Sequence, residues 1–332
     1  MEANQNPRQQ SRNPITKLIS WLDGYQQRHH VPAFTYAVIK KYGDDDAGRQ
    51  AALITYYGFL SLFPLMLVAT SVIGIVARHN ADLHARLVNT INNYLPSVGH
   101  QLQVSIHSSS KTGLALFVGL LFTLYGARGI ADAVRGALDH AWAVPRAKRS
   151  GFPKGLLKSL GLLLGAGLGL LLTTGLSSYA LAAFGHSFAS RAVPIFINVV
   201  LLYLLFMYVF LIGSSRRHSR KDTRLGAIVA TIGLLLLQTA GSYLITHQLH
   251  NLQGLYGQFA LVLAILFWIY LQAQVFVYAI ELNVVHTYKL WPRSVTGKPL
   301  TQADEKALRM YTEKEMRVIH PPEEIAVSFR KP

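Results

Sequence analysis

The chain has 332 residues, of which 51% are hydrophobic and 14% are charged, whereas a typical soluble domain has about 25% charged residues. This composition excludes a large soluble enzyme and indicates an integral membrane protein. The net charge of +16 is therefore better explained by basic loops that flank membrane spans than by nucleic-acid binding. The chain has no cysteine, which excludes disulfide bonds, thiolate catalysis and Cys-ligated zinc.

The N-terminal segment is polar and rich in Pro, Gln and Arg, and we expect residues 1–32 to be disordered and cytoplasmic. It contains no apolar signal-peptide core, so we expect the first membrane span to act as its own insertion signal. The next stretch, AFTYAVIKKY at 33–42, has the composition of an interfacial helix that lies on an anionic leaflet. The three acids at 44–46 indicate an N-cap for the following helix, with a metal site as the less favoured alternative.

The apolar segments predict an all-α fold, a polytopic membrane bundle of six transmembrane helices with additional amphipathic interfacial helices. A bilayer core about 30 Å thick requires roughly 20 apolar residues of helix. The longest charge-free run has 56 residues, between Arg224 and Glu281, and is long enough to cross twice with a turn at the polar residues 247–254. The membrane domain is predicted at 33–290 and a basic cytoplasmic tail at 291–332. The six spans are predicted at about 53–77, 112–134, 159–184, 193–213, 225–246 and 257–285.

Three of these spans carry local signals. Pro64 lies in the middle of the first span and predicts a kink. The second span is expected to continue beyond Arg128 as one long amphipathic helix. In the third span Gly161, Gly165 and Gly169 recur every four residues, which predicts a face that another helix approaches closely.

The basic residues predict that both termini lie in the cytoplasm. With six spans, the N-terminal segment, the loops at 128–158 and 214–224, and the C-terminal tail share one side of the membrane. These four segments hold 28 of the 32 Lys and Arg residues, so the positive-inside rule predicts an N-in, C-in topology. Within the tail, residues 301–318 are expected to form a solvated helix that opens with a capping-box-like TQAD sequence.

One acid, Glu281, falls inside the last span while the sequence is still apolar. A carboxylate in a membrane span is costly and is by default a functional hypothesis. Helical spacing places Tyr270, Gln274 and Tyr278 on the same face as Glu281. We expect Arg128, at a similar depth in the second span, to be its partner. Two interpretations remain open: a structural ion pair that joins two helices, and a site for substrate or protons.

Other polar residues leave their roles open. Gln238, with Thr239 and Ser242 beside it in the fifth span, either lines a path for a polar head group or forms hydrogen bonds between helices. His247 and His250 have helical spacing but no specified third ligand, so no metal and no other cofactor is predicted. The chain lacks the G-x-S-x-G, H-E-x-x-H, Walker A and Rossmann glycine motifs, and it is not predicted to be an enzyme.

Three blocks of the sequence resemble the YihY/BrkB family of bacterial inner-membrane proteins, over about residues 35–290. They are TYYGFLSLFPLML at 55–67, ADAVRGALDHAW at 131–142 and YGQFALVLAILFWIYLQAQVFVYAIELN at 256–283. Pro64 and Glu281 match the family pattern. The family usually has Asn where this chain has Asp139-His140, and Gly-Ala where this chain has Ala279-Ile280.

The resemblance implies a multi-pass protein of the bacterial inner membrane. Members of the family are linked to envelope integrity and serum resistance, and one branch is linked to export of lipid or lipopolysaccharide precursors. The resemblance also implies that the family's old ribonuclease label is a misassignment.

The favoured hypothesis is a transporter or flippase-like protein for an anionic envelope lipid or lipopolysaccharide precursor. In it, Arg128 or Arg135 receives the head group and Glu281 couples or gates. Gln274, Tyr278 and Gln238 are the further candidate substrate residues.

Two alternatives remain. One is a non-transporting envelope-integrity scaffold that binds partners through the outer loop and through the tail at 298–331. The least favoured is a ribonuclease, because no acids or histidines cluster in a soluble domain to hold catalytic metals. The expected partners are therefore membrane lipids and not nucleic acid, and the small-residue faces are compatible with a homo-oligomer.

Overall fold

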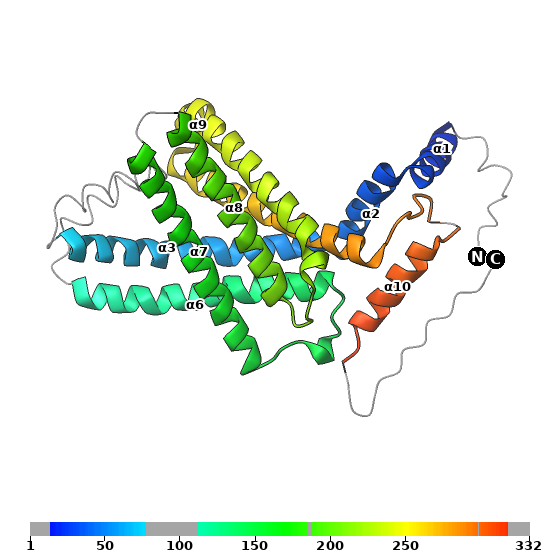
Figure 1. Cartoon of the computed structure of the whole chain (residues 1–332), viewed down its shortest axis with the longest axis horizontal. Helices are drawn as coiled ribbons and strands as arrows, with labels where there is room; N and C mark the ends of the chain where they lie inside the picture. The colour runs from blue at the N-terminus through cyan, green and yellow to red at the C-terminus, as the bar shows by residue number, and fades with distance from the viewer. Residues whose placement is uncertain (1–13, 78–111, 185–187, 298, 318–332) are drawn as a thin grey trace.

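The structure is a computed structural model, and it describes residues 14–77, 112–184, 188–297 and 299–317. These residues form helices and connecting loops without a strand, which confirms the all-α prediction for the described part of the chain (Figure 1). The elements are α1 (Pro14–Arg28), α2 (His30–Asp44), α3 (Ala47–Ala77), α6 (Thr112–Ala141), the short 3₁₀ helix η2 (Arg146–Lys148), α7 (Lys154–Phe184), α8 (Phe188–Gly213), α9 (Arg220–Tyr288) and α10 (Gln302–Lys314).

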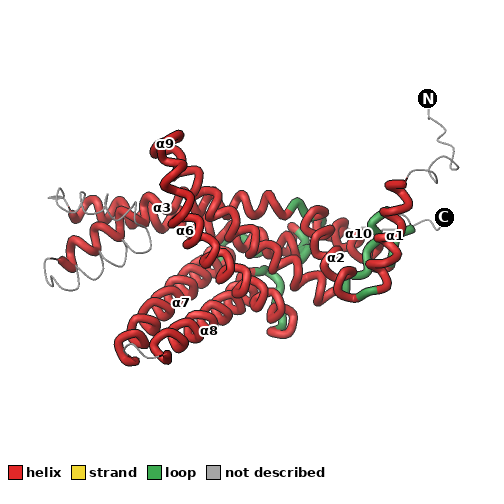
Figure 2. The backbone as a smooth tube through the Cα atoms, turned by 90° about the horizontal axis from the view of Figure 1, so that it is seen from above, coloured by secondary structure: helices red, strands yellow, loops and turns green. Residues whose placement is uncertain are grey.

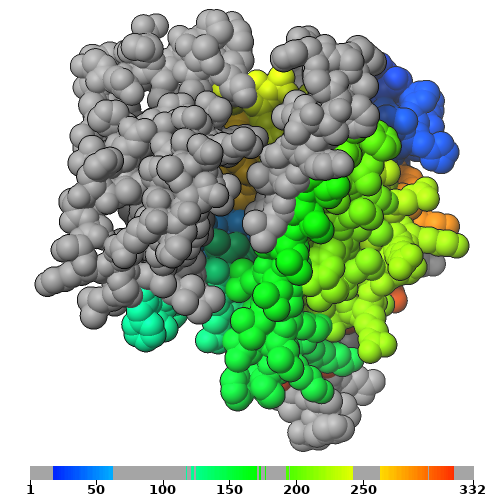
Figure 3. Space-filling model, turned by 60° about the vertical axis from the view of Figure 1, so that its left-hand side comes forward, coloured from blue at the N-terminus to red at the C-terminus, as the bar shows by residue number. Residues whose placement is uncertain are grey.

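The long helices pack as antiparallel pairs. In the α3–α6 pair, Gly126 lies against Ser61 and Gly129 lies against Tyr57. α7 and α8 form a second pair, and α9 packs against both α3 and α8. Seen from above, the α3–α6 pair and the α7–α8 pair diverge from a shared base (Figure 2). In the space-filling view, α7, α8 and the N-terminal part of α9 form one continuous face (Figure 3). We call this part, Arg220–Gly241, the first arm of α9.

α9 is a helical hairpin of 69 residues. A straight helix of that length would extend about 100 Å. In α9 the first arm and a second arm, Val262–Tyr288, instead lie side by side (Figure 1). The contacts between the arms are Gly226 with Ala279 and Asn283, Gly233 with Val275, and Gly241 with Trp268. The midpoint of these contacts lies near residue 254, so the hairpin predicted to turn at 247–254 is confirmed.

The backbone of α9 stays helical through this reversal, which the sequence analysis did not expect. The polar run HQLHNLQG at 247–254 has no proline and a single glycine, so no strong helix breaker is present. The side chains of Ser242, His247 and His250 lie outside the described part of the structure.

Three described segments are long and apolar enough to cross a bilayer, namely Ile195–Gly213, Arg220–Gly241 and Val262–Tyr288. They coincide with the last three predicted spans. The first three predicted spans, at 53–77, 112–134 and 159–184, lie within α3, α6 and α7 and are helical. The long helix expected beyond Arg128 is confirmed as α6. α3 is helical through Pro64. Six crossings, the kink at Pro64 and the N-in, C-in topology stay predictions.

The apolar core lies at the base, where α2, the ends of α6 and α8 and both arms of α9 converge. Its largest fully buried side chains include Trp142, Leu138, Phe210 and Ile280. Three helices and a loop form the base around this core: α2, α10 and the loop at 289–301 pack on the core, and α1 packs on α2 and on that loop. We call these four segments the basal layer. The capping box predicted at Thr301 is present, with the Asp304 amide donating to the Thr301 hydroxyl at 3.1 Å.

Two expectations about the N-terminal region are wrong. Residues 14–28 form α1 and are not disordered, whereas residues 1–13 lie outside the described part. α1 is held by tertiary contacts that composition does not reveal: Gln26 Nε2 donates to the Arg293 carbonyl at 2.6 Å, and the Val295 amide donates to Asp23 at 2.9 Å. The helix expected on the leaflet surface, at 33–42, instead packs on α9 within the basal layer.

The glycines of α7 face α8. The Tyr208 hydroxyl donates to the Gly161 carbonyl at 2.5 Å. A Cβ added to Gly165 would overlap the Tyr208 ring, and one added to Gly169 would approach Leu205 Cδ1 at 3.1 Å. The absence of side chains at these positions is therefore what allows α7 and α8 to lie this close.

We predict that Gly165→Ala destabilises the protein by about 1–3 kcal/mol, the usual effect of overpacking a close contact. Gly167→Ala is the matched control, because a Cβ there has no neighbour within 4 Å and alanine is the better helix former. Thermal unfolding of both variants in detergent measures the difference. Equal stability of the two variants would contradict the assigned α7–α8 contact.

Candidate functional site

Glu281 is fully enclosed by the protein and pairs with a lysine from α2. Its exposure is 1%, and that of Lys41 is 0%. Lys41 Nζ donates to Glu281 Oε2 at 2.8 Å, to the Ala141 carbonyl at 3.0 Å and to the carboxylate of Asp45. The prediction that Arg128 is the partner of Glu281 is therefore wrong. Small residues on α2, Ala33 and Ala37, are buried along with Lys41 and let α2 approach α9 closely.

The pair extends into a larger cluster that includes the C-terminal helix. Lys314 Nζ of α10 lies 2.9 Å from Asp45 Oδ1. His140 Nε2 lies 2.8 Å from the Asp45 carbonyl oxygen and 3.2 Å from Lys314 Nζ. We call Lys41, Asp45, Glu281 and Lys314, with His140 at their edge, the buried ion cluster. It joins α2, α6, α9 and α10.

This cluster overturns the expectation that the acids at 44–46 form a simple helix cap. Asp45 is 2% exposed and its carboxylate is shared by two lysines, Lys41 and Lys314. Asp44 instead pairs with Arg293, whose Nη1 lies 2.9 Å from Asp44 Oδ2. Within the described residues, no three His, Asp or Glu side chains are placed to hold a metal ion.

The groups of the cluster shift one another's pKa values. Burial alone would lower the pKa of Lys41, but the attraction of Glu281 and Asp45 outweighs burial and raises it. Burial alone would raise the pKa of Asp45, but Lys41 and Lys314 outweigh burial and lower it. Burial, together with the positive charge of Lys314, lowers the pKa of His140. The cluster therefore keeps Lys41 charged and Asp45 ionised beside a neutral His140.

The polar face predicted on the last span packs against α2. The Tyr42 ring stacks on Tyr278 with centroids 4.0 Å apart, and the Tyr42 hydroxyl donates to Gln274 Oε1. Gln274 Nε2 in turn donates to the Tyr270 hydroxyl at 2.5 Å. The structure thus brings Gln274, Tyr278 and Glu281 together through α2. Gln238 is exposed on the other arm of α9.

The two candidate arginines of α6 differ in their surroundings. Arg135 is buried and donates to the Gly155 carbonyl at 2.8 Å, to Ser159 Oγ at 3.0 Å and to the Ser150 carbonyl at 3.1 Å, which ties α6 to the start of α7. The side chain of Arg128 is 54% exposed, and its Nε lies 3.5 Å from Asp132 Oδ2. Arg128 is therefore the accessible one.

Arg128 lies at a level where the neighbouring helix carries no charge. The adjacent Gly129 packs against Tyr57 of α3. Tyr57 is eight residues beyond Arg49, or about 12 Å along the helix, and α3 has no charged residue after Arg49.

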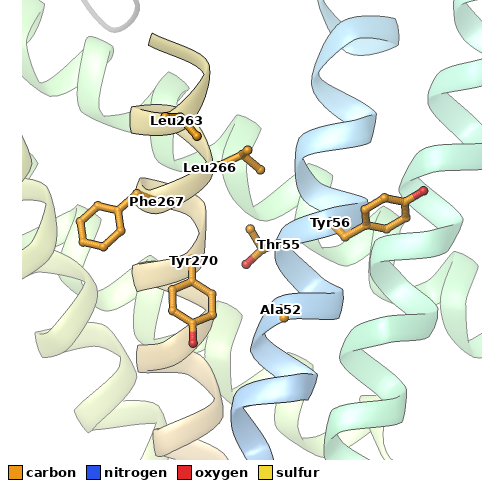
Figure 4. A pocket seen from close by; sticks show the side chains of 7 residues that line it. All are labelled: Ala52, Thr55, Tyr56, Leu263, Leu266, Phe267 and Tyr270. Carbon is orange, nitrogen blue, oxygen red and sulfur yellow. The ribbon is translucent and has the colours of Figure 1, made fainter. Parts of the chain in front are cut away.

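A groove of about 400 Å³ lies between α3 and the second arm of α9 (Figure 4). Its walls are largely apolar, and Thr55 and Tyr270 supply hydroxyl groups. In Figure 4, Leu266 and Tyr270 of α9 and Thr55 of α3 border the open space between the two helices. The complete lining is Ala52, Thr55, Tyr56, Leu263, Leu266, Phe267 and Tyr270.

A second buried carboxylate, Asp304, fixes α10 to the basal layer. It accepts hydrogen bonds from Arg293 Nε at 2.9 Å, the Ser294 amide at 2.9 Å, Lys40 Nζ at 3.0 Å and the Thr301 hydroxyl at 2.8 Å. Burial alone would raise the pKa of Asp304, but these hydrogen bonds outweigh burial and hold the pKa well below its usual range. α10 is therefore not the free, solvated helix expected from sequence.

Sequence reasoning missed four residues of the cluster: Lys41, Asp45, His140 and Lys314. One signal was available for Lys41, because it continues the spacing of Ala33 and Ala37 along one helical face. The composition of 33–42 instead favours a place for it, with its neighbour Lys40, on an anionic leaflet.

Long apolar helices together with internally paired charges define an integral membrane protein built from helices. The profile of the family described as Virulence factor BrkB matches residues 38–303, so the chain belongs to this family, which confirms the resemblance noted from the sequence.

Similar proteins are named as membrane proteins. A UPF0761 membrane protein of Pseudomonas paraeruginosa is 25% identical over 304 residues, which cover 86% of this chain and 72% of that protein. The inner membrane protein YhjD of Escherichia coli is 23% identical, with 80% of this chain and 85% of that protein covered. The putative ribonuclease-like protein YfkH of Bacillus subtilis is 22% identical, with 78% and 98% covered. No solved structure matches this chain significantly.

We predict that Lys41→Met destabilises the protein by about 3–5 kcal/mol, because it leaves Glu281 and Asp45 buried with one fewer cation. The double variant Lys41→Met/Glu281→Leu removes one charge of each sign and keeps the Asp45–Lys314 pair, so it is expected to recover much of the loss. A thermal-unfolding cycle with both single variants measures the coupling. Additive effects in this cycle would contradict the ion pair.

We also predict a pH-dependent contribution from Asp304. Its folded pKa lies below its unfolded value of about 4, so its stabilisation is fully present above that pH and is lost as the pH falls below it. The difference in unfolding temperature between wild type and Asp304→Asn is expected to be largest near pH 7 and to shrink below pH 4.

Glu315→Gln is the control for this experiment. Glu315 forms an exposed pair with Arg146 at 3.1 Å, and such surface pairs contribute little stability. A stability difference for Asp304→Asn that stays constant between pH 7 and pH 3 would argue against the assigned hydrogen bonds.

Proposed function

We propose that this protein moves an anionic lipid across the bacterial inner membrane, and that Arg128 receives the phosphate of the lipid head group. The observation that carries the proposal is the half-exposed Arg128–Asp132 pair at a level where α3 has no charged residue. An exposed ion pair at that depth cannot face acyl chains without a large desolvation cost. It requires water or a polar head group beside it.

The chemistry of Arg128 suits a phosphate. A guanidinium binds phosphate oxygens in a bidentate manner, and this one uses only Nε in a long contact with Asp132. A head group beside α6 therefore meets a cation with free donors. The neighbouring Arg135 has no accessible donors for a head group, because its contacts with α7 enclose its side chain.

The groove between α3 and the second arm of α9 supports a lipid as the substrate. It opens sideways from two helices of the bundle, and its apolar walls match an acyl chain better than a polar solute. Thr55 and Tyr270 place hydroxyl groups beside these walls. Since α3 lies between this groove and α6, the groove supports lipid contact independently of Arg128.

In this proposal Glu281 has a structural role and does not couple or gate transport, the role that the sequence had suggested. Its carboxylate is enclosed and paired with Lys41, so it holds α2 on α9 and does not meet the substrate. We accordingly assign Glu281 as a positioning residue for the base of the bundle.

The scaffold alternative has less support. It needs the tail as a free arm for partners, but α10 is bound through Lys314 and Asp304 to residues of α2 and of the loop after α9. Deleting the tail would therefore disturb the fold and would not test partner binding alone.

The test is lipid movement in liposomes that contain labelled phosphatidylglycerol, with labelled phosphatidylethanolamine in parallel, with and without a proton gradient. We expect Arg128→Ala to slow movement of the anionic lipid at least about tenfold, equivalent to about 1.4 kcal/mol of lost stabilisation. Arg128→Lys is expected to retain an intermediate rate, because a lysine keeps the charge but not the bidentate geometry.

Arg49→Ala is the matched control. Arg49 is 78% exposed and pairs with Asp46 at the start of α3, outside the charge-free part of the helix. It is expected to leave the rate within about twofold of wild type. If folded Arg128→Ala protein moves the lipid at the wild-type rate, Arg128 does not receive the head group. If the wild-type protein moves no lipid, the proposed function is wrong.

A further inference from the structure

We propose that α1 is a membrane-surface anchor, whose apolar face lies in the interfacial region of the leaflet next to the basal layer. This inference is independent of lipid transport, since it concerns how the protein sits on the bilayer and not what it moves. The sequence predicts an interfacial helix at 33–42; in the structure one face of that helix packs on α9, and α1 carries a longer exposed apolar stripe.

α1 has three distinct faces. One face carries Asp23 and Gln26, which are buried against the loop after α9. A second face is apolar and exposed, and it consists of Leu18, Trp21, Leu22 and Tyr25. The third is polar and consists of Ser20, Gly24, Gln27 and Arg28. The apolar positions follow i, i+3, i+4 and i+7 spacing, which is the pattern of one continuous helical stripe.

The attachment of α1 fixes its level relative to the bilayer. Gln26 binds the carbonyl of Arg293, and Asp23 binds the amide of Val295. These two residues lie only five and seven positions beyond Tyr288, the end of the last membrane-spanning segment. α1 is therefore held close to the plane in which that span leaves the membrane. Figure 1 shows α1 and α2 extending sideways from the base of the bundle, transverse to the second arm of α9.

The chemistry of the apolar face matches a lipid interface. Trp21 is 63% exposed and stacks on Tyr25 with ring centroids 5.8 Å apart. Trp and Tyr are the residues that concentrate at membrane–water interfaces, where one end of the ring is apolar and the other meets water. A helix in this position buries its apolar face about 5–10 Å into the boundary between head groups and acyl chains.

Charge favours the same occupant. α1 carries two cations, Lys17 and Arg28, and its single acid, Asp23, points into the protein. The exposed Arg28 lies beside the apolar stripe, and its charge complements an anionic leaflet. A second protein copy would not account for this cation beside the stripe.

The test uses the absence of cysteine from the chain. Single variants Leu22→Cys, on the apolar face, and Gly24→Cys, on the polar face, are labelled with a bimane fluorophore in the full-length protein. Both positions are exposed, and a side chain at Gly24 meets no atom within 4 Å. The labelled proteins are reconstituted in vesicles of phosphatidylglycerol and phosphatidylethanolamine that contain lipids brominated at carbons close to the head group.

We expect the brominated lipid to quench the label at position 22 several-fold more than the label at position 24, with the opposite order for aqueous iodide. Equal iodide quenching at both positions would overturn the anchor and place the apolar stripe in water. Protection of position 22 from both quenchers, with disulfide-linked dimers of the unlabelled Leu22→Cys protein, would also overturn it and identify a second copy as the occupant.

Discussion

The buried ion pair between Lys41 and Glu281 is the constraint on which the base of this protein depends. A charge removed from water is costly unless a partner of opposite sign and further hydrogen bonds are in place. Lys41 is enclosed, so its ammonium group needs Glu281, Asp45 and the Ala141 carbonyl at the same time. That requirement sets the register of α2 on α9 and the position of the end of α6. Asp45 then needs Lys314, which brings the C-terminal helix into the same assembly. The side chains of Lys41, Asp45, Glu281 and Lys314 thus join α2, near the N-terminus, and α10, near the C-terminus, to α9.

The rest of the bundle follows a different rule. Above the basal layer the helix pairs diverge, and many of their large apolar side chains are exposed to the surroundings and not to one another. In a bilayer such surfaces are already in an apolar solvent, so there is no hydrophobic force to close them together. Close packing is found where small residues permit it, as at Gly165 against Tyr208 and Gly241 against Trp268. The groove between α3 and the second arm of α9 lies among these spread helices, and in the proposed function it receives the lipid.

The features that were predictable from the sequence are those encoded locally. The charge-free run before Glu281 predicted the α9 hairpin, because its length and the polar turn are visible in the sequence. The box at Thr301 and Asp304 predicted the start of α10 for the same reason. The partner of Glu281 was not predictable in this way. Lys41 is 240 residues away. The composition of the segment around it, 33–42, matches a leaflet-binding helix as well as a helix that packs inside the protein. α1 was also missed, because its order depends on contacts with the loop after α9 and not on its own propensity.

The net charge of the chain is a poor guide to which residues bind anions, and the structure explains why. Several basic residues are paired inside the protein. Lys41, Arg293 and Lys314 form ion pairs with buried carboxylates, so their charge is not available to a ligand. Arg135 is likewise enclosed between α6 and α7. Arg128 stands apart from these, since it combines high exposure, a single long ion pair and a level at which its neighbour α3 is uncharged. The long contact with Asp132 offsets only part of the cost of placing this cation there, and in the proposed function a phosphate head group supplies the rest.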